Sequence, residues 1–110
     1  MSLTKIESYE VLYAANQFAP RIWLKNGTSY IGQLVFHPNG QSLPADGPDA
    51  NNPSLHYHLD DFHNALDLLR NENPLWLLYS GTGGGFENGI KTETEGTGEG
   101  EAGLKRFAIR

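Results

Sequence analysis

The dipeptide Asn26-Gly27 stands between two runs rich in β-branched and aromatic residues, residues 21–25 and residues 28–36. Asn-Gly in this position favours a type I′ turn, because both central residues of that turn need positive φ. The pattern therefore predicts an antiparallel β-hairpin. A second turn over residues 37–40 closes its second strand.

Other strands are predicted on both sides of this hairpin. Before it, Tyr9, Val11 and Tyr13 fall on one face of an extended segment, as in a half-buried strand. After it, short apolar runs predict strands at residues 55–59, 75–79 and 90–93. The run Leu75–Tyr79 is apolar on both faces, which is typical of an interior strand covered from two sides.

The hydrophobic period changes from two to 3.6 after residue 59. Phe62, Ala65, Leu66 and Leu69 fall at i, i+3, i+4 and i+7, which is the apolar stripe of an amphipathic helix. Either Asp60 or Asp61 is expected to cap the helix at its N-terminus. The helix is expected to end at residues 71–74.

The order of these elements predicts an α+β fold with a mixed, mostly antiparallel sheet of five or six strands packed on one helix. The strands at residues 55–59 and 75–79 flank the helix, so we expect them to be parallel and joined right-handedly. A helix of roughly a dozen residues spans only about 18 Å and cannot cover so wide a sheet. We therefore expect the sheet to curl into a half-barrel, with burial of its second face against another subunit as the alternative.

The chain of 110 residues is the size of one domain, which we place at residues 1–94. Residues 92–103 hold four glutamates and no basic residue, and glycine is frequent there. Residues 104–110 combine three apolar and three basic side chains with one alanine. We interpret residues 95–110 as a flexible acidic, glycine-rich tail with a short apolar and basic end.

Composition excludes several classes of function. The chain has no cysteine, so no disulfide, thiolate nucleophile or Cys-ligated metal centre is available. The net charge is −5 and there is no basic stripe, which disfavours binding to nucleic acid. The N-terminus is charged where a signal peptide is apolar, and no apolar run could span a bilayer. We expect a cytoplasmic protein without a membrane segment.

Residues 55–63 concentrate the groups that can bind a metal or move a proton at neutral pH. Three histidines and two aspartates lie within these nine residues. His56 and His58 share one face of the predicted strand, a spacing that suits zinc ligation. A metal site would be built on His56 and His58, with Asp60 or Asp61, and His63, as the further ligands. The alternative is a polar strand face followed by a capped helix.

The letters His56-Tyr57-His58-Leu59-Asp60 resemble the His-x-His-x-Asp-His motif of the metallo-β-lactamase superfamily. Asp61 stands where that motif has its last histidine, and the chain is too short for the superfamily's αββα sandwich. We therefore exclude this family. The segment from residue 55 to residue 74 is also similar to a stretch of small bacterial proteins of no assigned activity, and this resemblance implies no functional residue.

The sequence favours a non-catalytic binding or interaction module. The candidate binding residues are Trp23, His56, His58 and Trp76, because exposed aromatic and imidazole side chains are common at interfaces. The expected partner is another protein or a second copy of the chain, and no cofactor is expected. The alternative is a zinc-binding domain or metal-dependent hydrolase built on the His/Asp cluster of residues 56–63.

Overall fold

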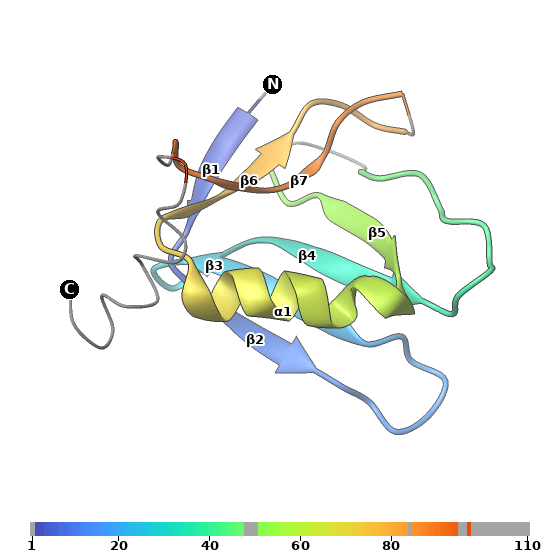
Figure 1. Cartoon of the computed structure of the whole chain (residues 1–110). Coiled ribbons are helices and arrows are strands. Elements are labelled where there is room, and N and C mark those ends of the chain that lie inside the picture. The colour runs from blue at the N-terminus through green and yellow to red at the C-terminus, as the bar shows by residue number, and fades with distance from the viewer. Residues whose placement is uncertain (1, 48–50, 84, 95–96, 98–110) are drawn as a thin grey trace.

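The computed structural model describes residues 2–47, 51–83, 85–94 and 97 and shows an α+β fold (Figure 1). The elements in chain order are β1 (Ser2–Ile6), β2 (Ser8–Leu12), β3 (Arg21–Asn26), β4 (Ser29–His37), β5 (Ser54–His58), a 3-10 turn (Leu59–Asp61), α1 (Phe62–Asn71), β6 (Leu75–Tyr79) and β7 (Gly89–Thr92). The strands form two sheets, in the orders β1-β6-β7 and β2-β3-β4-β5. All strand pairs are antiparallel except β4–β5. The predicted fold class and single helix are confirmed.

The prediction of one sheet of five or six strands is wrong, because the described strands divide into sheets of three and four. β5 does not pair with β6 across the helix; it pairs in parallel with β4, with Leu34 opposite Leu55. A helical crossover indicates how the chain returns, but the choice of neighbouring strand depends on long-range packing. The described strands close no barrel, and the half-barrel shape stays a prediction.

Strand β1 was not predicted from the sequence; it pairs antiparallel with β6 at one edge of the three-stranded sheet. Only Ile6 is buried among its five residues, so the apolar alternation that identifies a strand is missing. Glu7 alone separates β1 from β2, and its N–H donates to the Lys25 carbonyl oxygen at 2.8 Å. The chain thus passes from one sheet to the other at Glu7, which joins the two sheets.

The predicted β3–β4 hairpin is confirmed, but its turn lies one residue further along the chain. Asn26 pairs with Ser29, so Gly27 and Thr28 are the central residues of the turn. Gly27 has φ of 64°, and no described residue other than glycine has positive φ. Positive φ at the first central residue alone is the pattern of a type II′ turn, not the expected type I′.

Helix α1 buries the predicted stripe of Ala65, Leu66 and Leu69. The predicted aspartate cap is wrong: Asp61 holds the N-cap position, but its side chain makes no capping hydrogen bond. The preceding 3-10 turn accounts for this, because the Phe62 N–H already donates to the Leu59 carbonyl. A helix N-terminus whose N–H groups have backbone partners has less need of a side-chain cap.

Strand β6 is central in its sheet but is not fully covered from two sides, contrary to the prediction. Leu75, Leu77 and Tyr79 are buried, whereas Trp76 and Leu78 are only partly buried. Trp76 lies between Lys5 and Lys91 of the neighbouring strands, so the second face of β6 looks toward solvent. An apolar run therefore marked a central strand without showing which face was covered.

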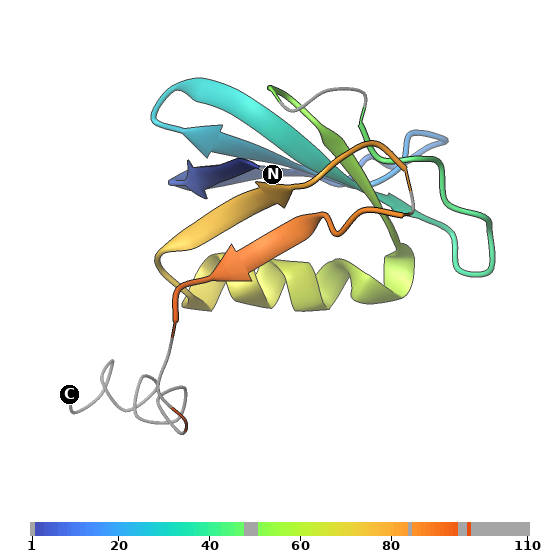
Figure 2. The same ribbon diagram turned by 90° about the horizontal axis from the view of Figure 1, so that it is seen from above.

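The core lies between α1 and the two sheets, and α1 is on one side of all the strands (Figures 1 and 2). Its fully buried members come from β3, β4 and β5 and include Ile22, Leu24, Leu34 and Phe36. No described helix covers the opposite, outer face of the four-stranded sheet. That face is therefore made of strand side chains.

Residues 95–110, predicted to be a flexible tail, lie outside the described residues except for residue 97. The domain boundary at residue 94 therefore stays a prediction. Within the described ranges, no helix is long and apolar enough to cross a membrane.

Candidate functional site

The outer face of the four-stranded sheet carries the aromatic and basic side chains of β3. Ile22 and Leu24 are fully buried. Because successive side chains of a strand point to opposite faces, Arg21, Trp23 and Lys25 lie on the outer face. All three are partly buried, since each is flanked by cross-strand neighbours. The alternation that builds the core thus also assembles the outer surface.

A hollow of about 520 Å³ lies on this face over β3, β4 and their turn. Its lining residues are Arg21, Trp23, Lys25, Thr28, Tyr30 and Gln33. We call it the Trp23 hollow. The rings of Trp23 and Tyr30 meet edge to face, with centroids 6.3 Å apart and planes at 80°. Such edge contacts hold two aromatic side chains in a defined orientation.

The two cations of the Trp23 hollow differ in their partners. Lys25 forms an ion pair with Glu10 of β2. The Nε atom of Arg21 is buried and has no hydrogen-bond partner. Arg21 also lies close enough to Tyr30 to favour its ionised form, but burial has the larger effect and raises the pKa of the Tyr30 phenol above 10.0. Arg21 has no ion pair among the described residues, so its positive charge is the one in the hollow that a ligand can still neutralise.

His37 and His56 form a pair beside this hollow, at the β4–β5 ladder. His37 Nε2 lies 2.8 Å from His56 Nδ1, so one ring nitrogen donates and the other accepts. The backbone N–H of His56 donates to Asp46 Oδ1 at 2.9 Å. Burial first, and then the nearby His37, lower the pKa of His56, while Asp46 acts in the opposite direction. This pair favours a neutral His56 at neutral pH.

His58 lies on the same face of β5 as His56 but has a different partner. Its Nε2 lies 2.8 Å from the carbonyl oxygen of Gln41, and this bond requires Nε2 to donate. His63 is exposed on α1, beside the ring of Phe62. The sequence-predicted histidines are therefore divided between β5, which carries His56 and His58, and the surface of α1, which carries His63.

The predicted metal ligands are not brought together. Asp60 exchanges two hydrogen bonds with Asn39, through its carboxylate and its backbone N–H, both at 2.9 Å. Asp61 lies on the α1 side of the fold, away from the outer face. In the part of the chain that the structure describes, no three His, Asp or Glu side chains form a group that could hold a metal ion.

Trp76, the fourth candidate binding residue, lies in the other sheet. Its Nε1 donates to Glu93 Oε1 at 2.6 Å. The structure therefore groups Trp23 with the histidines of β5 on one sheet and separates Trp76 from them. Sequence reasoning missed Arg21, Tyr30 and Gln33, although the strict alternation of β3 indicates that Arg21 shares the face of Trp23.

The described parts of the loops at residues 41–53 and 80–89 contact each other, and the Pro53 carbonyl oxygen also accepts from the N–H of Gln33, which lines the Trp23 hollow. Asp46 Oδ2 accepts from Asn88 Nδ2 at 3.0 Å, and Asn88 Oδ1 accepts from the Ser80 N–H at 2.7 Å. Asp46 therefore links β5 to the β6–β7 loop, because its other oxygen binds the His56 backbone.

Comparison with protein-family models, with curated proteins and with solved structures finds no match to this chain. The chemistry of the site is therefore argued from its side chains and their contacts.

Proposed function

We propose that this chain is a small, non-catalytic binding module that takes up a cytoplasmic protein partner on the outer face of its four-stranded sheet. The centre of the surface is the Trp23 hollow, and His56 and His58 of β5 extend it toward the far edge. The observation that carries the proposal is the hollow itself, in which two aromatic rings in edge contact line the same surface as Arg21, whose charge has no ion pair among the described residues.

The chemistry of the hollow favours a partner with a carboxylate beside an apolar side chain. Trp, Tyr and Arg are the residues that most often dominate binding energy at protein interfaces. Trp23 and Tyr30 supply contact area, and their edge contact reduces the conformational entropy lost on binding. Arg21 supplies a positive charge beside these rings, which attracts a carboxylate of the partner.

The partner can be captured by affinity purification with the full-length chain, its Trp23→Ala variant and its Arg21→Gln variant. Phe86→Ala is the matched control, because Phe86 is an aromatic residue 53% exposed on the β6–β7 loop. We expect a partner that the wild type and Phe86→Ala retain and that both hollow variants lose. A partner retained equally by all four proteins would contradict the proposal, provided that circular dichroism shows them to be folded.

Two further measurements decide what kind of partner binds. Analytical ultracentrifugation tests self-association, and a dimer that Trp23→Ala dissociates would identify the partner as a second copy of the chain. Aromatic and basic side chains on a sheet can also bind single-stranded nucleic acid. Tight binding of a single-stranded RNA that Trp23→Ala abolishes would overturn the proposal of a protein partner.

A further inference from the structure

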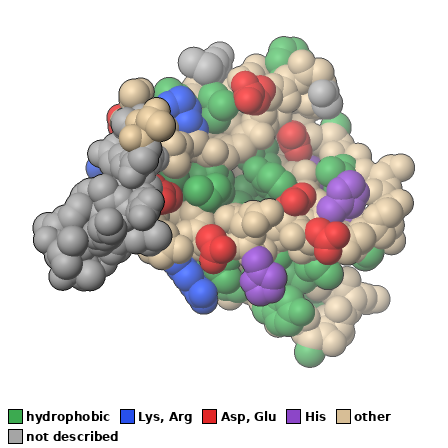
Figure 3. All heavy atoms as spheres, in the orientation of Figure 1, with side chains coloured by type: hydrophobic (Ala, Val, Ile, Leu, Met, Phe, Trp, Pro, Cys, Tyr) green, Lys and Arg blue, Asp and Glu red, His purple; other side chains and the backbone are tan. Residues whose placement is uncertain are grey.

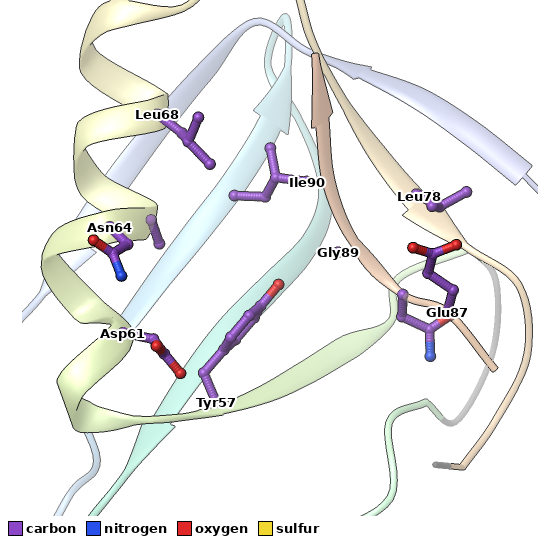
Figure 4. A pocket seen from close by; sticks show the side chains of 10 residues that line it. Tyr57, Asp61, Asn64, Leu68, Leu78, Glu87, Gly89 and Ile90 are labelled. Carbon is purple, nitrogen blue, oxygen red and sulfur yellow. The ribbon is translucent and has the colours of Figure 1, made fainter. Parts of the chain in front are cut away.

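A second cavity lies on the other side of the molecule, between α1, the end of β5 and the edge strand β7 (Figure 4). Its volume is about 400 Å³, within the range of small-molecule sites. Its lining residues are Tyr57, Asp61, Asn64, Ala65, Leu68, Leu78, Glu87, Asn88, Gly89 and Ile90. We call it the Tyr57 groove. Neither Lys nor Arg is among these residues, so the groove has acidic and neutral walls only.

The floor of the Tyr57 groove is apolar and its rim is acidic. Leu68 of α1 faces Ile90 of β7 across the groove, and Ala65 is a further apolar lining residue from α1. Figure 3 shows acidic side chains around an apolar centre on this face of the molecule. Asp61 and Glu87 line the groove from its opposite walls (Figure 4). The groove therefore offers a ligand an apolar floor with a negatively charged carboxylate on each side of it.

Neither carboxylate has a partner of its own in the described ranges. Asp61 is partly buried at the start of α1, yet it makes no capping hydrogen bond there. The one ion pair among the described residues, Lys25 with Glu10, lies on the other sheet face. A partly desolvated carboxylate without a counter-charge gains from a cation more than an exposed one does, because solvent screens it less.

Tyr57 completes the site with a fixed, neutral phenol. Its ring stacks on Phe36, with centroids 5.6 Å apart, and a Cβ added at Gly89 would lie 3.3 Å from its hydroxyl. Burial, followed by the charges of Asp46 and Asp61, raises the pKa of Tyr57 to about 12. The phenol therefore stays protonated at neutral pH, and the effect of the two aspartates shows that the potential there is negative. An aromatic face and a hydroxyl oxygen are both favourable neighbours of an ammonium group.

We infer that the Tyr57 groove binds a small primary alkylammonium ligand. Its ammonium group lies at the acidic rim beside Asp61, and its hydrocarbon part lies over Ala65, Leu68 and Ile90. Glu87 adds negative charge from the opposite wall. The groove's volume fits a free amine rather than a folded partner. This site is separate from the Trp23 hollow and does not depend on the proposed protein partner.

The test is a titration of the full-length chain with n-pentylammonium. Binding is monitored through the chemical shifts of the backbone NMR signals of Ala65, Leu68 and Ile90. The control ligand is 1-pentanol, which has the same hydrocarbon and no charge. We expect saturable shifts with the amine and no saturation with the alcohol. Equal binding of both ligands, or no saturable shift with the amine, would overturn the inference.

Variants on the groove test whether the two carboxylates hold the ammonium group. We expect Asp61→Asn to weaken binding by roughly tenfold, since a charge-assisted contact is lost. Glu87→Gln, at an exposed loop position that folding does not need, should weaken it by a smaller factor. The matched control is Asp67→Asn, an exposed carboxylate on the same helix but outside the groove. Equal weakening by Asp67→Asn would show diffuse attraction and refute the site.

A final titration separates a free amine from the lysine side chain of another protein. Nα-acetyl-lysine methylamide carries the same ammonium group on a peptide-like body. Binding weaker than that of n-pentylammonium supports a free amine. If the lysine derivative bound more tightly than n-pentylammonium, the assignment to a small-molecule ligand would be overturned.

Discussion

The two faces of the four-stranded sheet are made by the same strands but have opposite properties. On the inner face, Ile22, Leu34 and Phe36 are fully buried against the helix and the second sheet. On the outer face, Trp23 and Arg21 alternate with those residues yet remain partly exposed. Opposite faces of the same strands can therefore serve stability and recognition separately. The inner side chains hold the fold, and the outer ones are free to bind.

The largest expected effect comes from truncating the inner face at its largest fully buried side chain. Phe36 contacts both Tyr57 and Phe62, at centroid distances of 5.6 and 5.0 Å. We expect Phe36→Ala to lower the free energy of unfolding by about 3–5 kcal/mol, through lost burial and the cavity left behind. Urea denaturation measures the change.

Trp23→Ala is the outer-face counterpart and should cost about 1 kcal/mol or less, because Trp23 is already partly solvated. A loss of unfolding free energy for Trp23→Ala as large as that for Phe36→Ala would contradict this difference between the two faces. It would mean that the outer face also belongs to the core.

The second effect concerns Gly32, where the backbone of β4 packs closely against Pro53 and Leu77. A Cβ at Gly32 would lie 2.8 Å from the Pro53 carbonyl oxygen and 3.0 Å from Leu77 Cδ2. We expect Gly32→Ala to lower the free energy of unfolding by about 1–3 kcal/mol, since neither neighbour can move without disturbing the core. Thermal unfolding would measure it. Gly85→Ala is the control, because nothing lies within 4 Å of a Cβ there. A Gly32→Ala variant as stable as this control would show that the inner face is loosely packed.

The third effect is a pH dependence that belongs to the outer face. The pKa of His56 is lowered in the folded state, so in the pH range just below 6.5 the unfolded chain binds more protons than the folded one. The free energy of unfolding should therefore fall as the pH drops from 7.5 to 5.5. Urea midpoints at the two pH values measure this slope.

His56→Gln should reduce the pH slope, whereas His63→Gln, at an exposed helix position, should leave it unchanged. The slope would remain in His56→Gln if other groups caused it. That result would show that the His37–His56 pair does not cause the pH dependence of the free energy of unfolding.

The smallest expected effect is that of the exposed ion pair between Lys25 and Glu10. Removing it with Glu10→Gln should change the free energy of unfolding by about 0–1 kcal/mol, because solvent screens such pairs. The same variant frees Lys25 at the rim of the Trp23 hollow, so it should strengthen binding of a carboxylate-bearing partner. Weaker partner binding by Glu10→Gln would show that Glu10 itself is part of the binding surface.

Local pattern predicted some elements well and failed at others for identifiable reasons. The helix was predictable because the apolar stripe of Ala65, Leu66 and Leu69 is a property of one segment. β1 was not, because a strand with one buried side chain carries almost no pattern of its own. The expected side-chain cap at Asp61 does not form because a 3-10 turn, which propensity does not reveal, satisfies the Phe62 N–H.

The candidate site shows the same division. The sequence identified Trp23, His56 and His58 as candidates, and the structure places them on one face of one sheet. It could not show that Trp76 belongs to the other sheet, or that His37 pairs with His56. These facts depend on which strands become neighbours.

By itself, the sequence determined the fold class, the β3–β4 hairpin, the helix and its buried stripe, because these follow from turn chemistry and from hydrophobic period within short segments. Only the tertiary structure decided the division into two sheets, the parallel pairing of β4 with β5, the Trp23 hollow and the Tyr57 groove. The physical reason is that strand pairing and cavities arise from contacts between residues far apart in the chain. Many pairings satisfy the same local pattern, and the packing of the whole core selects one of them.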